Sequence, residues 1–303
     1  MPVCVIFNPA AKGGKARRFQ RSLKAFGPAC TFRPTAGPGS ARVLATAAVN
    51  EGFDTLVAAG GDGTLNEVLN GMAEAPGGLE RARLGVLPLG TVNVLARELK
   101  VPARIEPAWR IIQQGHETRI DLCWARWTEG ARAGQRCFVQ LAGAGLDARA
   151  IERVSWKLKQ RIGWLAYVAA GWQVLWERQP AIRITAGGRV EAGELVLMGN
   201  GRFYGGNFSL FPGAKMDDGL LDVLVFRQVN WRTACRCVWG VFARRLDRQS
   251  GLSHFQTNSV VLDSNTTVAW EADGEWVGRL PVTITIQPRA LRMIVPGLKP
   301  VQT

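Results

Sequence analysis

The sequence lacks paired cysteines and is poor in histidine. None of its six cysteines belongs to a Cys-x-x-Cys pair, and Cys235 and Cys237 lack the second pair that a zinc site needs. Thiols in a reducing cytosol fit this pattern better than a disulfide framework. The two histidines, His116 and His254, lie in no motif, so we expect surface residues rather than parts of a Ser-His-Asp or Cys-His site.

Long apolar runs are also missing. No stretch approaches the roughly 20 residues that cross a bilayer. The apolar start of the chain is too short for a signal peptide, and no basic region precedes it. We therefore expect a protein that is cytoplasmic or peripheral on a membrane.

Acidic residues are outnumbered by basic ones, 24 against 38, which gives a formal net charge of +14. Such a chain attracts anions, whether nucleic acids, nucleotides or an anionic membrane surface, although the charge could also serve solubility alone. No DNA-binding motif is present, so nucleic acid is not an expected partner. The apolar content of 47% excludes a disordered chain, and 303 residues suit two compact units.

The two parts of the chain have different patterns. Up to about residue 120, strand and helix signals alternate, which predicts parallel strands with crossover helices. Short β-rich segments punctuated by Gly, Asn and Asp follow, and they predict an antiparallel sheet or sandwich. The expected fold is therefore a parallel-sheet α/β domain over 1–120, which the C-terminal tail can rejoin, and a β-rich domain over 121–303.

Two helical segments interrupt the β-rich part, at Ile151–Glu177 and Trp231–Arg248. Both combine tryptophans with basic residues, and the second holds Trp231, Arg232 and Arg236. Such a mixture suits a membrane interface, but an amphipathic helix with a basic outer face explains it equally well.

A glycine-rich junction, Gly60-Gly61-Asp62-Gly63-Thr64, joins an apolar strand signal to a helix expected over Leu65–Met72. Glycines at such a turn let a phosphate approach the backbone, and the start of the helix offers N–H groups to an anion. Asp62 suits this place if a divalent cation or a hydroxyl mediates. Thr64 could cap the helix or bind a phosphate oxygen. A plain tight turn is the alternative.

The junction matches neither the Rossmann GxGxxG pattern nor the GK[ST] of a P-loop. Two further loops, Asn8–Ala16 with its lysines and Pro88–Asn93, also follow strand signals. The carboxyl ends of parallel strands meet at one edge of a sheet, so three such loops together indicate a polyphosphate site more strongly than any one of them.

"GGDGTLNEVLNG" followed by "LGVLPLGTVNVLARELKVP" resembles the catalytic domain of the diacylglycerol kinase family, especially its soluble bacterial lipid kinases. "LAGAGLDARA", "GNGRFYGGNFSLFPGAKMDDGLLDV" and "EADGEWVG" also look like family blocks in family order, so the resemblance spans nearly the whole chain. It implies an ATP- and Mg²⁺-dependent kinase that phosphorylates a hydroxyl of a lipid such as diacylglycerol or phosphatidylglycerol.

The resemblance also implies which residues contact the nucleotide. The chain departs from the family in two places, with "GPGSA" after Thr35 and with Val94 where the family often has aspartate. Carried over by position, the nucleotide contacts would be Asn8, Thr35, Gly60, Gly61, Asp62, Gly63, Thr64, Leu65, Asn66 and Thr91.

"KMDDGLLDV" resembles the magnesium loop of the family. By carry-over, Asp218 would provide a carboxylate, and Lys215 and Leu220 would provide backbone carbonyls. Oxygen ligands of this kind suit Mg²⁺. An Asp-Asp-Gly hairpin turn without an ion is the alternative.

"ADGEW" provides the candidate catalytic base, because the resemblance gives this role to Glu275. The transfer needs a group that takes the proton of the acceptor hydroxyl. Asp62 is the rival for this role, although we expect it to act on the metal and the phosphates. A solvated Glu275 beside an Asp273-Gly274 hairpin turn is the alternative.

Two other functions remain open. An NAD-kinase-like enzyme would have a soluble acceptor, and a basic membrane-binding protein would keep the fold without catalysis. As a lipid kinase, the protein would meet its substrate at the inner face of the membrane. The sequence leaves the oligomeric state open, a homodimer included.

Overall fold

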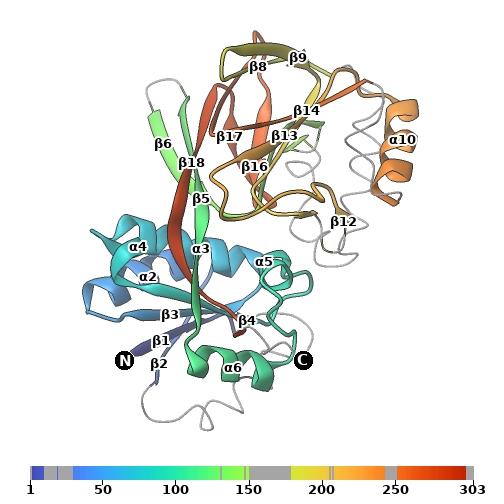
Figure 1. The fold of residues 1–303 in the computed structure, drawn as a ribbon. Helices are drawn as coiled ribbons and strands as arrows, with labels where there is room; N and C mark the ends of the chain where they lie inside the picture. Colours follow the sequence, from blue (N-terminus) through green and yellow to red (C-terminus); the bar gives the residue numbers. More distant parts are fainter. Residues whose placement is uncertain are drawn as a thin grey trace. The chain divides into compact units, whose positions relative to one another are not determined.

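The computed structural model describes residues 2–9, 19, 30–129, 132–146, 148–149, 179–204, 206, 208–242 and 251–297 (Figure 1). The chain divides into two compact units, Met1–Leu122 with Pro288–Thr303, and Cys123–Gln287. The predicted helix over 151–177 and most of the lysine loop after Asn8 lie outside the described residues.

The first unit is built on parallel strands in the order β2-β1-β3-β4, which confirms the predicted α/β domain. The last strand of the chain, β18, adds to β4, where Met293 pairs in parallel with Leu84. These strands are β1 (Val3–Phe7), β2 (Cys30–Pro34), β3 (Thr55–Gly60), β4 (Arg83–Pro88) and β18 (Val282–Ile294).

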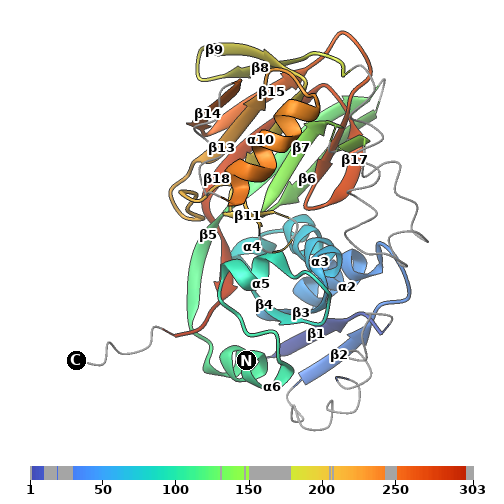
Figure 2. The ribbon, with the colours of Figure 1, turned by 90° about the vertical axis from the view of Figure 1, so that its right-hand side faces the viewer.

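Helices cover both faces of this sheet, so β3 is buried along its whole length. Helices α2 and α3 lie on one face and α6 on the other (Figures 1 and 2). The helices of this unit are α2 (Ser40–Asn50), α3 (Asp62–Glu74), α4 (Gly78–Arg81), α5 (Val94–Glu98) and α6 (Ile105–Gln114).

Helix α3 buries Leu65, Val68, Leu69 and Met72, the spacing of one helical face. It also contacts α2 closely at Gly71. A Cβ atom on Gly71 would lie 2.2 Å from the carbonyl oxygen of Arg42, so only glycine permits this approach.

The start of α3 differs from the expectation. The helix begins at Asp62 rather than Leu65, and Gly61 is its N-cap residue. Thr64 is therefore in the first turn of the helix, and the predicted capping role of Thr64 is wrong. The backbone turns helical directly after Gly61, whose φ of −94° and ψ of −172° are extended.

The second unit is an antiparallel β-sandwich, as predicted. One sheet contains β18-β15-β8-β9 with β5 and β6, and the other has the order β14-β13-β10-β7-β16-β17. The strands are β5 (Glu117–Glu129), β6 (Arg132–Phe138), β7 (Leu141–Gly145), β8 (Ile182–Ala186), β9 (Arg189–Gly193), β10 (Leu195–Gly199), β11 (Phe203–Tyr204), β12 (Phe208–Ser209), β13 (Leu221–Phe226), β14 (Leu252–Thr257), β15 (Ser259–Asp263), β16 (Ala269–Ala272) and β17 (Glu275–Arg279).

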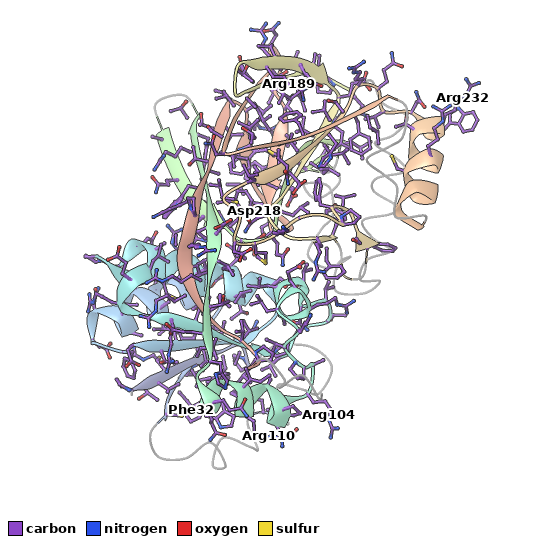
Figure 3. The ribbon with its side chains drawn as sticks, viewed as in Figure 1. Phe32, Arg104, Arg110, Arg189, Asp218 and Arg232 are labelled. Carbon is purple, nitrogen blue, oxygen red and sulfur yellow. The ribbon has the colours of Figure 1, made fainter. Side chains whose placement is uncertain are left out.

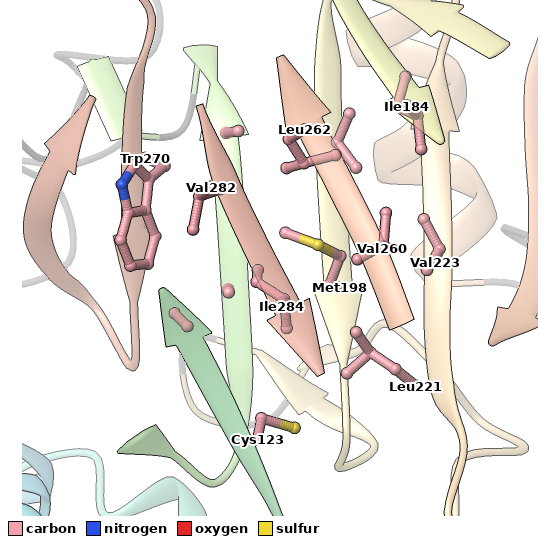
Figure 4. Packing of buried hydrophobic residues seen from close by; sticks show 14 of the residues in the cluster. Cys123, Ile184, Met198, Leu221, Val223, Val260, Leu262, Trp270, Val282 and Ile284 are labelled. Atoms are coloured by element: carbon pink, nitrogen blue, oxygen red, sulfur yellow. The ribbon is translucent and has the colours of Figure 1, made fainter. Parts of the chain in front are cut away.

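The sandwich core lies between the two sheets (Figure 4). Strand β8 shows the expected alternation, with Ile182 and Ile184 buried and Arg183 exposed. Strands β10 and β13 are buried on both faces because a second apolar cluster covers the outer face of their sheet. Helix α10 (Trp231–Phe242) packs onto this second cluster through Cys237.

The β-rich segment "RCFVQLAGAG" is divided between two sheets. Strand β6 ends at Phe138, and β7 begins at Leu141. The amide groups of Val139 to Leu141 bind the Asp273 carboxylate instead of continuing a strand ladder.

Across the described ranges, none of the helices has the length and the apolar character needed to span a bilayer.

Candidate functional site

The glycine junction of the first unit lies where β3 passes into α3. Gly60 ends β3, and Thr64 folds back over it, so that a Cβ atom on Gly60 would lie 2.4 Å from the Thr64 hydroxyl oxygen. The glycine is therefore needed for close packing within the loop, which supports a shaped turn rather than a loose one.

A second loop, which follows β4, is held tightly against this junction. The amides of Leu89 and Gly90 donate hydrogen bonds to the carbonyl oxygen of Gly60, at 2.9 and 3.1 Å. Gly90 also faces Gly61, and a Cβ atom on Gly90 would lie 2.5 Å from the Gly61 Cα atom. The two predicted phosphate loops thus form one packed unit of backbone.

Asp62 joins the same two loops through its side chain. Its Oδ1 atom accepts a hydrogen bond of 2.8 Å from the amide of Val94, the first residue of α5. The neighbouring Asn93 has a left-handed backbone, with φ of 53°, and its side chain bonds back to Gly90 at both the N–H and the C=O. Val94 therefore contributes through its backbone, whatever its side chain.

The N-terminus of α3 lies at this junction, and no side chain among the described residues caps it. The first N–H groups of a helix have no partner within the helix, and together with the helix dipole they suit an anion. Gly61 and Gly63 are partly exposed. Leu65 and Asn66 are buried, and the Asn66 side chain accepts a hydrogen bond from Asn70 at 3.0 Å.

Glu67 is not among the predicted site residues, and it positions the loop after β2. Its two carboxylate oxygens accept hydrogen bonds from the amides of Gly39, at 2.8 Å, and Ala41, at 3.0 Å. The loop contains Thr35, whose amide binds the Phe7 carbonyl oxygen at 2.9 Å. Glu67 lies within the "GGDGTLNEV" motif, and its position in that motif could have indicated that it has a role in the site.

The four loops after the parallel strands therefore converge at one edge of the sheet. Asn8 follows β1 and donates its amide to the Ala59 carbonyl oxygen at 3.1 Å. Thr35, Gly61 and Thr91 follow β2, β3 and β4. The structure brings these predicted nucleotide contacts together within the first unit.

Replacing Gly90 with alanine is expected to lower the free energy of unfolding by about 1–3 kcal/mol, because the new Cβ atom would push the loop away from Gly61. Urea unfolding would measure the change. Gly213→Ala is the matched control, since nothing lies within 4 Å of its Cβ position. An unchanged free energy of unfolding in Gly90→Ala would contradict the close contact of the two loops.

In the second unit, the register gathers polar residues at one end of the sheet that contains β10 and β13. Asp222 pairs with Gly199, and Gly199 pairs with Leu141 on its other side. Ala272 pairs with both Ala142 and Glu275. The segment before β13, the turn after β16 and the start of β17 therefore lie at the same end of one sheet.

The turn after β16 is a two-residue hairpin, as the alternative reading of "ADGEW" predicted. Asp273 and Gly274 both have positive φ, 49° and 79°, which is typical of a type I′ turn. The turn has a further function, because the Asp273 carboxylate accepts three backbone N–H bonds, from Val139, Gln140 and Leu141 at 3.0 to 3.1 Å. These bonds fix the hairpin beside Glu275.

Glu275 begins β17 and is held in place by an arginine. Its Oε2 atom lies 2.5 Å from Nη2 of Arg136 on β6, and 37% of the Glu275 side chain is exposed. The carboxylate is thus oriented and still open to solvent. No motif in the sequence indicates Arg136.

The predicted magnesium loop forms an exposed turn before β13, where Figure 3 labels Asp218. The Asp218 Oδ1 atom accepts a hydrogen bond of 3.0 Å from the Leu220 amide. A carboxylate beside backbone carbonyls is a donor set that fits Mg²⁺. No cluster of three His, Cys, Asp or Glu side chains that could hold a metal occurs in the described ranges.

The cysteines do not form an alternative site. Burial raises the pKa of Cys4 and of Cys237 to about 11, so both thiols are protonated and unreactive at neutral pH. The described cysteines Cys4, Cys30, Cys123, Cys137 and Cys237 are all free thiols.

Comparisons with known proteins give a matching family model for each of the two units. Residues 2–125 match the family model of the diacylglycerol kinase catalytic domain, and residues 140–295 match the YegS C-terminal NAD kinase beta sandwich-like domain. A protein of Staphylococcus aureus strain RF122 / ET3-1, named diacylglycerol kinase, is 30% identical over 97% of this chain and 92% of its own length. Its namesake in strain JH9 is 31% identical over 86% and 80%.

Solved structures share the fold. A crystal structure of a diacylglycerol kinase from Bacillus anthracis strain Sterne has a TM-score of 0.70 at 23% identity, with 97% of this chain and 96% of that chain covered. Another chain from the same organism has a TM-score of 0.79 at 24% identity, with 97% and 95% covered.

Proposed function

The chain belongs to the diacylglycerol kinase family, and from this premise we propose that it transfers the γ-phosphate of ATP to a hydroxyl of a lipid such as diacylglycerol or phosphatidylglycerol. The observation that carries the proposal is the pair of loops at the sheet edge of the first unit, where glycine backbone and Asp62 are fixed together.

The first unit would hold the phosphates of ATP. The amides at the start of α3 lie beside glycines, which let an anion come close, and the helix dipole adds a partial positive charge. Asp62 is fixed by its bond to the Val94 amide, so its carboxylate would orient a cation that neutralises the phosphates.

Glu275 would act on the acceptor. Its carboxylate takes the proton of the lipid hydroxyl while that oxygen bonds to the γ-phosphorus, and the bond from phosphorus to the bridging oxygen breaks. The electron pair of the broken bond stays on the bridging oxygen, which leaves as part of ADP. Arg136 holds Glu275 in one orientation, so little rearrangement is needed during the transfer.

Mg²⁺ would be held in the second unit by the Asp218 carboxylate and by the carbonyl oxygens of Lys215 and Leu220. The bound ion would supply positive charge at the end of the sheet where Glu275 lies. The Leu220 amide donates to the Asp218 carboxylate, so two of these three residues already lie close together.

The acceptor lies in a bilayer, and helix α10 provides a surface suited to its inner face. Trp231 is 52% exposed at the start of the helix, and the Arg232 guanidinium lies 5.3 Å from the centre of the Trp231 ring. Figure 3 shows Arg232 pointing away from the sheets of its unit. A tryptophan beside exposed arginines suits the headgroup region of anionic lipids.

The direct test is an assay of acceptors. Purified protein is incubated with labelled ATP, Mg²⁺ and a total lipid extract, and the labelled product is identified by mass spectrometry. We expect a phosphorylated lipid whose formation stops when EDTA removes the metal. A parallel reaction with NAD tests the NAD-kinase-like alternative, because the family model that matches the second unit is NAD kinase beta sandwich-like. Label in NAD alone, or in nothing, would overturn the proposal.

Replacing Arg232 and Arg236 with glutamine is expected to weaken binding to anionic vesicles by about 30-fold, at about 1 kcal/mol for each charge. Both side chains are exposed on α10. Sedimentation with vesicles of phosphatidylglycerol and phosphatidylcholine would measure the change. The double variant of Arg126 and Arg183, exposed on β5 and β8, is the control. Equal binding of both double variants would contradict a docking role of α10.

A further inference from the structure

Gln140 is a buried polar side chain that the mechanism above does not use. It lies in the two-residue break between β6 and β7 and is only 5% exposed. Within the part of the chain that the structure describes, neither Oε1 nor Nε2 of Gln140 has a hydrogen-bond partner. A buried carboxamide with two unpaired ends is unusual and calls for a reason.

Both backbone groups of Gln140 are hydrogen-bonded, which fixes the position of its main chain. Its amide donates to Oδ1 of Asp273 at 3.0 Å. Its carbonyl oxygen accepts from the amides of Asn200 and Gly201, at 2.9 and 3.3 Å. Three segments that are far apart in the sequence thus meet at Gln140.

The side chain lies directly on Gly201. A Cβ atom at Gly201 would lie 2.0 Å from Oε1 of Gln140, so any larger residue there would displace the carboxamide. The glycine of "GNGR" therefore makes room for a glutamine whose polar side-chain atoms find no partner among the described residues. Asn200 supports the same segment, because its Nδ2 atom donates to the Val139 carbonyl oxygen at 2.9 Å.

Stability does not explain this arrangement. A buried polar group without a partner costs about 1–3 kcal/mol, whereas an apolar side chain of the same shape is close to neutral. Methionine has nearly the shape of glutamine and would fill the space without that cost. A carboxamide at this position therefore points to a ligand.

The position of Gln140 indicates which ligand. The Gln140 amide is hydrogen-bonded to Asp273, at the polar end of the sheet. Asp273 precedes Glu275 by two residues. A carboxamide presents one acceptor and one donor side by side. A glycerol-based lipid with a free hydroxyl next to an ester carbonyl presents the complementary donor and acceptor.

We propose that the Gln140 carboxamide binds the glycerol backbone of the acceptor lipid, accepting from its hydroxyl and donating to its ester carbonyl. This inference rests on the proposed function and adds a specificity-determining residue to it. The lipid would satisfy both ends of the carboxamide. Only a lipid whose hydroxyl and ester carbonyl are adjacent would gain this binding energy.

The test uses Gln140→Met. We expect kcat/KM for a short-chain 1,2-diacylglycerol to fall by about 10–100-fold, while the KM for ATP is unchanged and the melting temperature is equal to or above that of the wild type. A loss of activity without a loss of stability would separate ligand binding from a structural role. Gln135→Met, an exposed glutamine on β6, is the control and should behave as the wild type.

The outcomes are distinct. Full activity of Gln140→Met would overturn this inference but leave the kinase function intact. The Gln140 carboxamide would then bind only an internal water. No lipid phosphorylation by the wild type would instead overturn the proposed function. If Gln140→Met does not fold, Gln140→Glu keeps the shape but loses the donor, and unchanged lipid kinetics in that variant would equally overturn the inference.

Discussion

Glu275→Gln is expected to lower kcat for lipid phosphorylation by about 10²–10⁴-fold, the usual contribution of a general base. Glutamine keeps the shape of the side chain and can still accept the hydrogen bond from Arg136. The change therefore removes the proton acceptor while it preserves the geometry. The measurement is single-turnover phosphoryl transfer at saturating ATP and lipid, with the melting temperature recorded for the same sample.

The control for this variant is Glu117→Gln. Glu117 also pairs with an arginine, Arg292, at 3.0 Å, and lies outside the proposed site. It should retain wild-type activity, because an exposed ion pair contributes little to stability. Full activity of Glu275→Gln would show that another group takes the proton, and Asp62 would then be the remaining candidate.

Asp62→Asn is expected to lower kcat by about 10²–10³-fold, as the loss of one preorganised electrostatic group does in other enzymes. The asparagine Oδ1 atom can still accept the bond from the Val94 amide, so the two loops stay joined. The variant thus separates the charge of Asp62 from its structural link. Steady-state kinetics at varied Mg²⁺ would show whether added metal compensates in part.

Asp62→Ala completes this test because it removes the link as well as the charge. If Asp62 served only to join the loops, Asp62→Asn would be nearly as active as the wild type and only Asp62→Ala would be impaired. Asp54→Asn is the control, at the opposite end of β3 from the glycine junction. Asp54 precedes β3 and accepts a bond from the Thr55 hydroxyl at 2.9 Å, away from the glycine junction.

The fold was predictable from the sequence because its signals are local. Gly60 to Thr64 stand between a β-branched strand and an amphipathic helix, and the Asp273-Gly274 pair marks its own hairpin turn. The start of α3 was placed three residues late, because Asp62 and Gly63 are poor helix formers and the backbone was expected to turn there.

The partners of the site residues could not be predicted, because they come from distant segments. Glu275 and Arg136 are separated by 139 positions in the sequence, and Asp273 binds amides 132 to 134 positions earlier. No periodicity or spacing links such residues. The register of the folded sheet makes them neighbours, and only the structure contains that register.

The path of β18 has a consequence for biosynthesis. Met293 is fully buried where it pairs with Leu84 of β4, so the last strand of the chain completes a sheet begun by its first residues. During translation, the early strands leave the ribosome with β4 as an open edge, which is prone to wrong pairing. The nascent polypeptide must therefore reach β18 before the sheet of the first unit is closed at this edge.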